Sequence, residues 1–285
     1  MFIDQLVAYF WMKYMKKTFT DFLGRNIEIE FPPKRIISLV PSQTELILDL
    51  IGTDRLIGIT KFCVHPKDKT SKISKIGGTK NPNIKQIESL KPDLIIANKE
   101  ENELSDIAEI SKFCPVWVSE ISDFEDSMKM IAKLGIIFQE SDKAQQIIEQ
   151  INLNRNLLQQ KKIELKFDRE IIYLIWKNPW MAAGKDTFIN SMLSDSGFKN
   201  SIKKERYPQI TLDEIADLNP EMILLSSEPY PFSQKHVELL KKELPNCEII
   251  LVNGEYFSWY GNRLIAAYQY FTELIQSISK KTNRK

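Results

Sequence analysis

Residues 254–264, GEYFSWYGNRL, place four aromatic rings just before one arginine, Arg263. The rings are those of Tyr256, Phe257, Trp259 and Tyr260. A helix or a strand can bury only one side of such a run, so some rings should remain near the surface. Flat apolar side chains beside a positive charge suit a broad ligand that carries polar atoms at its rim.

Metal binding and acid–base catalysis are two other kinds of chemistry to consider. The only histidines are His65 and His236, and the pair Cys63-x-His65 falls short of a complete metal site. Glu100, Glu101 and Glu228 could act as paired carboxylates if burial separated their pKa values. However, these glutamates occur in polar loops, where we expect them to be solvated.

The sequence also lacks the usual catalytic motifs. It contains no G-x-S-x-G motif, no phosphate-cradling glycine loop and no histidine placed to serve as a base. We therefore predict a non-catalytic protein with no protein-ligated metal and no required cofactor.

Composition narrows the class of protein further. The 285 residues carry a formal net charge of +1, which gives no support to a nucleic-acid partner. Three widely separated cysteines are typical of reduced thiols. No stretch approaches the length of a membrane span. The length fits two lobes of ordinary size.

The N-terminal segment MFIDQLVAYFWMKYMKK differs from a signal peptide. Asp4 interrupts its apolar run, the lysines follow that run instead of preceding it, and no lipid-accepting cysteine comes after it. The sequence as given therefore favours a cytoplasmic protein, and Met15 is an alternative start.

Short β-rich runs alternate with helical patterns after residue 33. The runs are 35–40, 56–60, 94–97 and 116–118. Ser42 is expected to cap a helix over 42–52, which Gly52 ends. This alternation predicts right-handed βαβ units and mostly parallel sheets, that is, an α/β fold.

One long segment and one internal echo predict the domain organisation. Residues 141–165 contain no Gly or Pro and keep helical spacing of apolar residues, which favours a rigid helix joining two lobes over a surface helix within one domain. Segments 84–102 and 212–230 share a helix, a Pro-acid turn, a strand and a polar loop, so one α/β unit occurs on each side of that helix. The predicted parts are an extension (1–33), a lobe (34–140), the connecting helix (141–166) and a second lobe (167–285).

Ligands bind beyond the carboxyl ends of the strands in such sheets. The loops expected there are 41–43, 61–66, 98–102, 176–185, 226–232 and 253–260. Their large side chains are Phe62, His65, Trp176, Trp180, Met181, Tyr230, Phe232, Tyr256, Trp259 and Tyr260. We predict that these side chains line a ligand cleft between the lobes, with Ser42, Asn98 and Arg263 at the ligand rim. The alternative is that the rings of 256–260 fill the core of the second lobe.

Four segments resemble the class III solute-binding proteins of ABC importers, the helical-backbone receptors for cobalamin and iron siderophores. They are RIISLVPSQTELILDLIG, ITKFCVHP, IGGTKNPNIKQIESLKPDLIIA and NPWMAAGKDTFINSML. They occur in the family's order, cover about residues 34–280, and look closest to the cobalamin-binding branch. The resemblance implies a monomer with two α/β lobes on a backbone helix, a periplasmic location and delivery of ligand to a permease.

The resemblance also assigns individual residues. Phe62 falls where the cobalamin receptors place a ligand-stacking tyrosine, Thr79 falls where a tryptophan stacks on the ligand, and Arg263 matches an arginine near the second wall. Trp176, Trp180 and Met181 lie on the second-lobe loop that contacts the ligand. The expected ligand is cobalamin or another corrinoid, with haem and ferric siderophores as alternatives.

Docking to the permease is the point at which the chain departs from that family. An acidic residue on each lobe of the importer-linked relatives meets permease arginines, and these positions fall on Lys85 and Asp213. A lysine facing arginine replaces an attraction by a repulsion, so we expect weak docking. The alternative function is a cytoplasmic protein that handles corrinoid, haem or siderophore, with or without enzymatic activity, uncoupled from a permease.

Overall fold

The computed structural model describes residues 16–282, and the segments 1–15 and 283–285 lie outside the described residues. The interpretation of the N-terminal segment and of Met15 as a start therefore concerns residues outside that range. The chain forms two compact units. Among the described residues, unit 1 holds those up to Ile121 together with Asp126–Ile148 and Tyr260–Asn262, and unit 2 holds Ser122–Glu125, Glu149–Trp259 and those from Arg263 to residue 282.

The sheet of unit 1 is parallel throughout, in the order β5-β4-β3-β6-β7. Its strands are β3 (Ile36–Ser38), β4 (Leu56–Ile59), β5 (Ser74–Lys75), β6 (Leu94–Asn98) and β7 (Val116–Ser119). The helices between and after them are α2 (Pro41–Ile51), α3 (Lys67–Thr70), α4 (Ile84–Ser89), α5 (Leu104–Ile110) and α6 (Phe124–Phe138). The four β-rich runs predicted for this half of the chain are thus confirmed as strands.

Helix α2 begins one residue earlier than predicted, and Ser42 does not cap it. Its N-cap residue is Val40, with no side-chain cap, and Pro41 occupies the first helical turn. Proline suits that position because its fixed φ is helical and its missing N–H would be unpaired there anyway. The predicted end is confirmed, since Gly52 adopts φ 68° and donates its N–H to Leu48.

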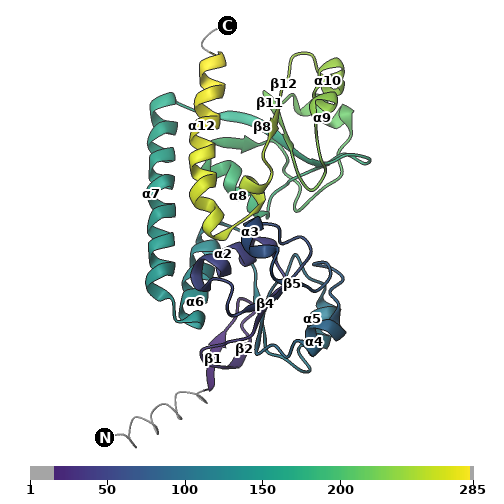
Figure 1. Ribbon diagram of the computed structural model, residues 1–285. Helices are drawn as coiled ribbons and strands as arrows, with labels where there is room; N and C mark the ends of the chain where they lie inside the picture. The colour runs from purple at the N-terminus through teal and green to yellow at the C-terminus, as the bar shows by residue number, and fades with distance from the viewer. Residues whose placement is uncertain (1–15, 283–285) are drawn as a thin grey trace, which may run out of the picture. The chain divides into compact units, whose positions relative to one another are not determined.

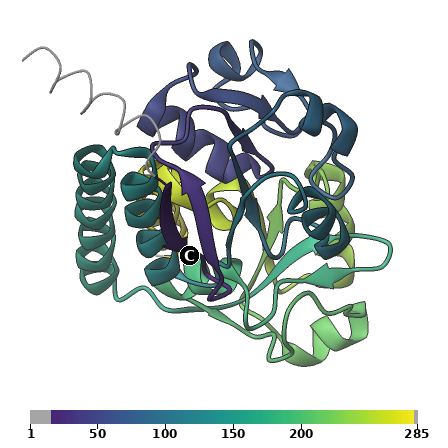
Figure 2. The same ribbon diagram turned by 90° about the horizontal axis from the view of Figure 1, so that it is seen from below.

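Residues 16–30 form a β-hairpin that the sequence analysis did not predict (Figure 2). Strands β1 (Lys16–Thr20) and β2 (Asn26–Glu30) pair antiparallel. Ile29 is only 2% exposed, and Phe31, just after β2, is buried as well. Apolar residues at alternate positions of NIEIE put one face of β2 against the core, as the strand period requires.

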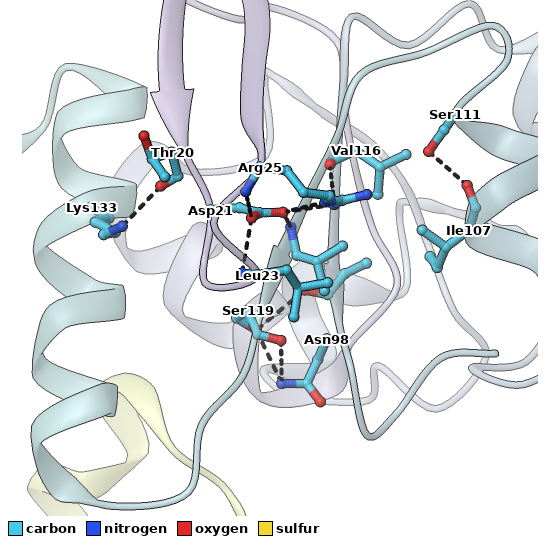
Figure 3. Close-up of polar contacts among 12 residues, drawn as sticks. Thr20, Asp21, Leu23, Arg25, Asn98, Ile107, Ser111, Val116, Ser119 and Lys133 are labelled. Atoms are coloured by element: carbon cyan, nitrogen blue, oxygen red, sulfur yellow. Dashed lines mark hydrogen bonds and ion pairs between the residues drawn. The ribbon is translucent and has the colours of Figure 1, made fainter. Parts of the chain in front are cut away.

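The turn of this hairpin is attached to β7 by Asp21 (Figure 3). The Asp21 carboxylate accepts hydrogen bonds from the Arg25 side chain at 2.7 and 2.8 Å and from the Leu23 N–H at 2.9 Å. Arg25 in turn donates to the carbonyl of Val116, and the Phe22 N–H donates to that of Val118. The hairpin is therefore an integral part of unit 1.

The sheet of unit 2 has the order β10-β8-β11-β12, with the short strand β9 paired antiparallel to β8. Its strands are β8 (Arg169–Trp176), β9 (Met181–Ala182), β10 (Phe198–Asn200), β11 (Met222–Ser226) and β12 (Glu248–Val252). Its helices are α8 (Phe188–Asp195), α9 (Leu212–Leu218), α10 (Gln234–Glu243), α11 (Glu255–Ser258), the 3-10 turn η1 (Gly261–Arg263) and α12 (Leu264–Thr282). The α/β fold with mostly parallel sheets is confirmed.

Helix α7 (Ser141–Leu165) is continuous, as predicted from the absence of Gly and Pro. Within unit 2 it lies beside α12, the long C-terminal helix (Figure 1). The Asn154 side chain donates to the carbonyl of Ile265 at 2.9 Å, and Arg155 forms a double hydrogen bond with Asp195 at the end of α8. No helix among residues 16–282 is long and apolar enough to cross a membrane.

The internal echo is confirmed as a repeated helix–turn–strand unit, α4–β6 and α9–β11. In the first copy the carboxylate of Asp93 accepts the N–H groups of Lys34 and Arg35 at the start of β3. In the second copy Glu221 accepts the N–H of Glu170 at the start of β8. The acid after each proline thus ties its own strand to the neighbouring strand in the same way.

Candidate functional site

Four aromatic side chains of unit 2 lie in the loops that follow β8 and β11. We call Trp176, Trp180, Tyr230 and Phe232 the aromatic array. Strand β8 ends at Trp176, a tight turn leads through Trp180 into β9, and Tyr230 and Phe232 follow β11. Because β8 and β11 are parallel neighbours, their carboxyl ends meet at one edge of the sheet.

The rings of the array are in mutual contact. Trp180 and Phe232 are stacked, with centroids 6.0 Å apart and planes 4° apart, and Trp176 meets Tyr230 edge-on at 5.5 Å. Tyr230 and Phe232 lie 4.7 Å apart. Phe232 belongs to the buried core, whereas Trp176 is 39% exposed. The array therefore presents apolar rings to solvent on a support that is anchored in the core.

His236 lies behind the array and is 3% exposed. Its Nδ1 accepts the N–H of Ser233 at 3.0 Å, and its Nε2 lies 3.3 Å from the Tyr230 hydroxyl. Burial lowers the pKa of His236, and the positive charges of Lys235 and Lys177 lower it further. The imidazole is therefore neutral at physiological pH, which a buried ring against aromatic neighbours requires.

The aromatic run 256–260 divides between core and half-buried positions. Phe257 is fully buried against Tyr173 and Phe271, and Tyr256 packs on Tyr270 with centroids 4.8 Å apart. Trp259 is half-buried, and its indole Nε1–H donates to Glu228. Core packing thus accounts for Phe257, and Trp259 keeps part of its surface accessible.

Glu228 is half-buried, contrary to our expectation of a fully solvated side chain. Burial raises the pKa of its carboxyl, and Ser258 and Trp259 both donate to its Oε1. The loop can come this close because residue 254 is glycine, where a Cβ would lie 2.2 Å from Ser226 Oγ and 2.8 Å from Glu228 Cγ. A polar loop composition could not reveal this contact between segments distant in sequence.

The Arg263 side chain contacts Trp259 and Glu255, which belong to unit 2 as Arg263 does. Its guanidinium lies 4.6 Å from the Trp259 ring centroid and donates to Glu255 at 2.7 Å. Its side chain is only 11% exposed. The predicted contact of Arg263 with a ligand rim therefore stays a prediction, and the structure gives this arginine a supporting role beside Trp259.

In unit 1, Phe62 is the accessible member of the predicted set. It is 51% exposed, with the Lys61 ammonium 5.1 Å from its ring centroid. His65 is half-buried in the same loop, and Thr79 lies in the neighbouring turn, where its carbonyl accepts the Asn102 amide at 2.9 Å. Phe62 and His65 thus follow the carboxyl end of β4, and Thr79 follows that of β5, the neighbouring parallel strand of unit 1.

The other predicted residues of unit 1 belong to a buried polar network. Asn98 donates to both the carbonyl and the hydroxyl of Ser119 (Figure 3). It also accepts the N–H groups of two following residues, Glu100 and Glu101. Ser42 and Tyr260 are buried; the Tyr260 hydroxyl accepts a hydrogen bond from the Gln43 amide and shares one with the Ser42 side chain. The network fixes the loop that follows β6.

Sequence reasoning did not name Lys177, and it considered His236 only as a metal ligand and Glu228 only as an acid–base group. The available signal for His236 was its place three residues after Ser233 at the start of a helix, where the two side chains can form a capping box. The cysteines carry free thiols, and no group of three metal-ligating side chains occurs among the residues that the structure describes.

Comparison with known proteins assigns the family. Residues 36–243 match the family of periplasmic binding proteins, to which the chain therefore belongs. It is 30% identical over 217 residues to the uncharacterized ABC transporter substrate-binding lipoprotein YvrC of Bacillus subtilis, covering 73% of this chain and 68% of that protein. It is 24% identical over 242 residues to the vitamin B12-binding protein of Salmonella paratyphi A, covering 82% of this chain and 86% of that protein.

A solved structure shows the same fold. The periplasmic heme-binding protein RhuT from Roseiflexus sp. RS-1, in its apo form, aligns with a TM-score of 0.76 at 16% identity and covers 86% of this chain and 99% of its own. The predicted resemblance to substrate-binding proteins of ABC importers is thus confirmed. The relatives named here are binding proteins, and their names include more than one kind of ligand.

Proposed function

We propose that this protein is a non-catalytic substrate-binding protein for a large planar metal chelate, a corrinoid in the first place, which it holds for ABC-type import. The observation that carries the proposal is the aromatic array at the carboxyl ends of β8 and β11. Its rings contact each other, and all but Phe232 remain partly exposed, with Trp176 39% exposed. Such rings offer a flat apolar surface to a macrocycle.

The comparisons support the ligand class. One relative is named a vitamin B12-binding protein and one structural neighbour a heme-binding protein. A corrinoid and haem are both broad, flat chelates that already carry their metal. The protein would then need no metal-ligating side chains of its own, and the aromatic surface would supply most of the affinity.

In the decisive experiment, the purified protein is mixed separately with cyanocobalamin, cyanocobinamide, haemin and a ferric hydroxamate siderophore. Binding is then measured by visible absorbance and native mass spectrometry. We expect one-to-one binding of a corrinoid. Trp180→Leu keeps an apolar side chain but removes the flat face, and it should weaken binding by about 1–3 kcal/mol, the scale of burying one large side chain. Leu104→Ala, an exposed position of α5, is the control.

Two results would contradict the proposal. The first is no binding of any of these chelates to folded wild-type protein. The second is unchanged affinity in Trp180→Leu, which would mean that the array is only core and that ligand binds elsewhere. Turnover of a bound chelate would overturn the non-catalytic part.

A further inference from the structure

The hydroxyl of Tyr230 has a defined hydrogen-bond direction because His236 fixes it. The backbone N–H of Ser233 points at Nδ1 of His236 at 3.0 Å, so Nδ1 must be the unprotonated, accepting nitrogen. The proton of the neutral ring is then on Nε2, which lies 3.3 Å from the Tyr230 oxygen. Tyr230 therefore accepts a hydrogen bond from His236.

Since Tyr230 accepts from His236, its own O–H proton is available to donate elsewhere. Among residues 16–282 this hydroxyl has no second hydrogen-bond partner. The side chain is half-buried and contacts the partly exposed Trp176. A phenol that accepts a hydrogen bond on one side is a better donor on the other, because linked hydrogen bonds polarise one another.

The charges that act on His236, the partner of this hydroxyl, are positive. The ammonium of Lys177 lies 5.5 Å from the ring centroid of Trp180 and forms no ion pair with the described residues. Lys235 precedes His236, and both lysines act on the pKa of its ring. The nearest acid in sequence, Glu228, has its Oε1 occupied by Ser258 and Trp259. This edge of the array favours an oxygen that is negatively charged or strongly accepting.

We propose that Tyr230 donates a hydrogen bond to an acceptor oxygen on the rim of the ligand, with His236 as its positioning residue and Lys177 favouring a carboxylate over an amide. The inference rests on the proposed function and adds a polar specificity element to it. The amides at the rim of a corrinoid and the carboxylates at the rim of haem both offer acceptor oxygens. Cyanocobalamin and haemin, measured side by side, distinguish these two kinds of ligand.

The test measures dissociation constants for cyanocobalamin and haemin by absorbance titration. Tyr230→Phe removes only the hydroxyl. It should weaken cyanocobalamin about 3- to 10-fold, as expected for a neutral hydrogen bond, and haemin about 10- to 100-fold, as expected for a charged acceptor. Lys177→Gln should weaken haemin and leave cyanocobalamin unchanged.

Matched substitutions of His236 separate positioning from packing. His236→Asn keeps an acceptor near Nδ1 for Ser233 but removes the donor to Tyr230, so it should reproduce Tyr230→Phe and add nothing to it in the double variant. His236→Gln restores a donor near Nε2 and should bind as wild type. Circular dichroism and thermal unfolding confirm that each variant is folded.

The possible outcomes are distinct. If Tyr230→Phe binds both probes as wild type while Trp180→Leu binds them weakly, the Tyr230–His236 pair is only structural and this inference is wrong, although the proposed function stands. If His236→Gln fails to restore what His236→Asn loses, the positioning role is wrong. If wild-type protein binds neither probe, the inference fails together with the chelate-binding proposal.

Discussion

The indole Nε1–H of Trp259 donates a 3.0 Å hydrogen bond to Oε1 of Glu228, and the Ser258 hydroxyl donates to the same oxygen at 2.8 Å. On its ring face, Trp259 is covered by the guanidinium of Arg263. Two polar contacts therefore fix the orientation of a half-buried tryptophan. The pKa of the Glu228 carboxyl therefore differs between the folded and the unfolded chain.

We predict that Glu228 makes the stability of the protein fall as pH rises. Burial raises the pKa of its carboxyl above the ordinary value of 4.5, the nearby Glu255 adds to this, and the hydrogen bonds from Ser258 and Trp259 oppose it. The folded chain then binds the proton more tightly than the unfolded chain. The contribution of Glu228 is thus fully present below the unfolded pKa and is lost as pH rises through the folded pKa.

The measurement is urea unfolding of wild type and Glu228→Gln at a series of pH values from 4 upward. Glutamine keeps an acceptor oxygen for Ser258 and Trp259 but cannot ionise, so this variant should lose less stability across that range than wild type. Glu238→Gln, at an exposed position of α10, is the control. Identical pH profiles for wild type and Glu228→Gln would show that burial does not govern this carboxyl.

We predict that Asp195 is a main stabilising contact between α7, α8 and α12. Its carboxylate accepts two hydrogen bonds from Arg155, at 2.8 and 3.0 Å, and one from the Tyr268 hydroxyl at 2.5 Å. Tyr268→Phe should lower the free energy of unfolding by about 1–2 kcal/mol, the range for a hydrogen bond to a charged group. Asp195→Ala should cost about 3 kcal/mol because it leaves the partly buried Arg155 unpaired.

Urea unfolding of the single variants and of the double variant tests this. The losses should not add, since both substitutions remove the Tyr268–Asp195 contact. Lys199→Gln, which breaks a solvent-exposed pair with Asp168, should leave stability unchanged. Additive losses, or a loss below about 1 kcal/mol for Asp195→Ala, would contradict the prediction.

The elements of the repeated α/β unit and the helix α7 were predictable because their signals are local. Residues 141–165 keep apolar spacing without a helix breaker, and the Pro-acid turns mark the starts of β6 and β11. The hairpin β1–β2 was missed because its strands are short and its attachment depends on Asp21 meeting β7, a contact distant in sequence. Similarly, the aromatic residues of the array were predictable by type, whereas the neutral His236 and the half-buried Glu228 depend on tertiary contacts.

We predict that the hairpin loses its attachment to unit 1 when Asp21 is replaced. Asp21 is 3% exposed, and Asp21→Ala would leave the N–H groups of Leu23 and Arg25 without their acceptor and the Arg25 guanidinium with only the Val116 carbonyl. Hydrogen exchange at the Phe22 amide, which donates to Val118, should become at least tenfold faster in this variant. In contrast, Glu28→Gln breaks only the exposed pair with Lys16 and should leave that exchange rate unchanged. Equal exchange rates in wild type and Asp21→Ala would refute the role of Asp21.

The last prediction concerns the permease, for which the repeated unit offers a matched pair of positions. Lys85 is the second residue of α4 and Asp213 the second residue of α9, and both are exposed. The two copies of the unit thus present opposite charges at equivalent places. A permease that offers an arginine to each copy would attract Asp213 and repel Lys85, so docking to a cobalamin-type importer should be weak.

Lys85→Glu should therefore strengthen binding to a reconstituted importer of that type, by about tenfold or more at low salt and less at high salt, because the attraction is screened. Lys112→Glu makes the same change of net charge at an exposed position after α5, and it should have little effect on binding if the gain depends on position. Asp213→Lys should abolish the binding that remains. If the wild type docks strongly and Lys85→Glu does not improve docking, the prediction is wrong. The permease would then contact other residues, and Lys85 would be compatible with a fully coupled importer.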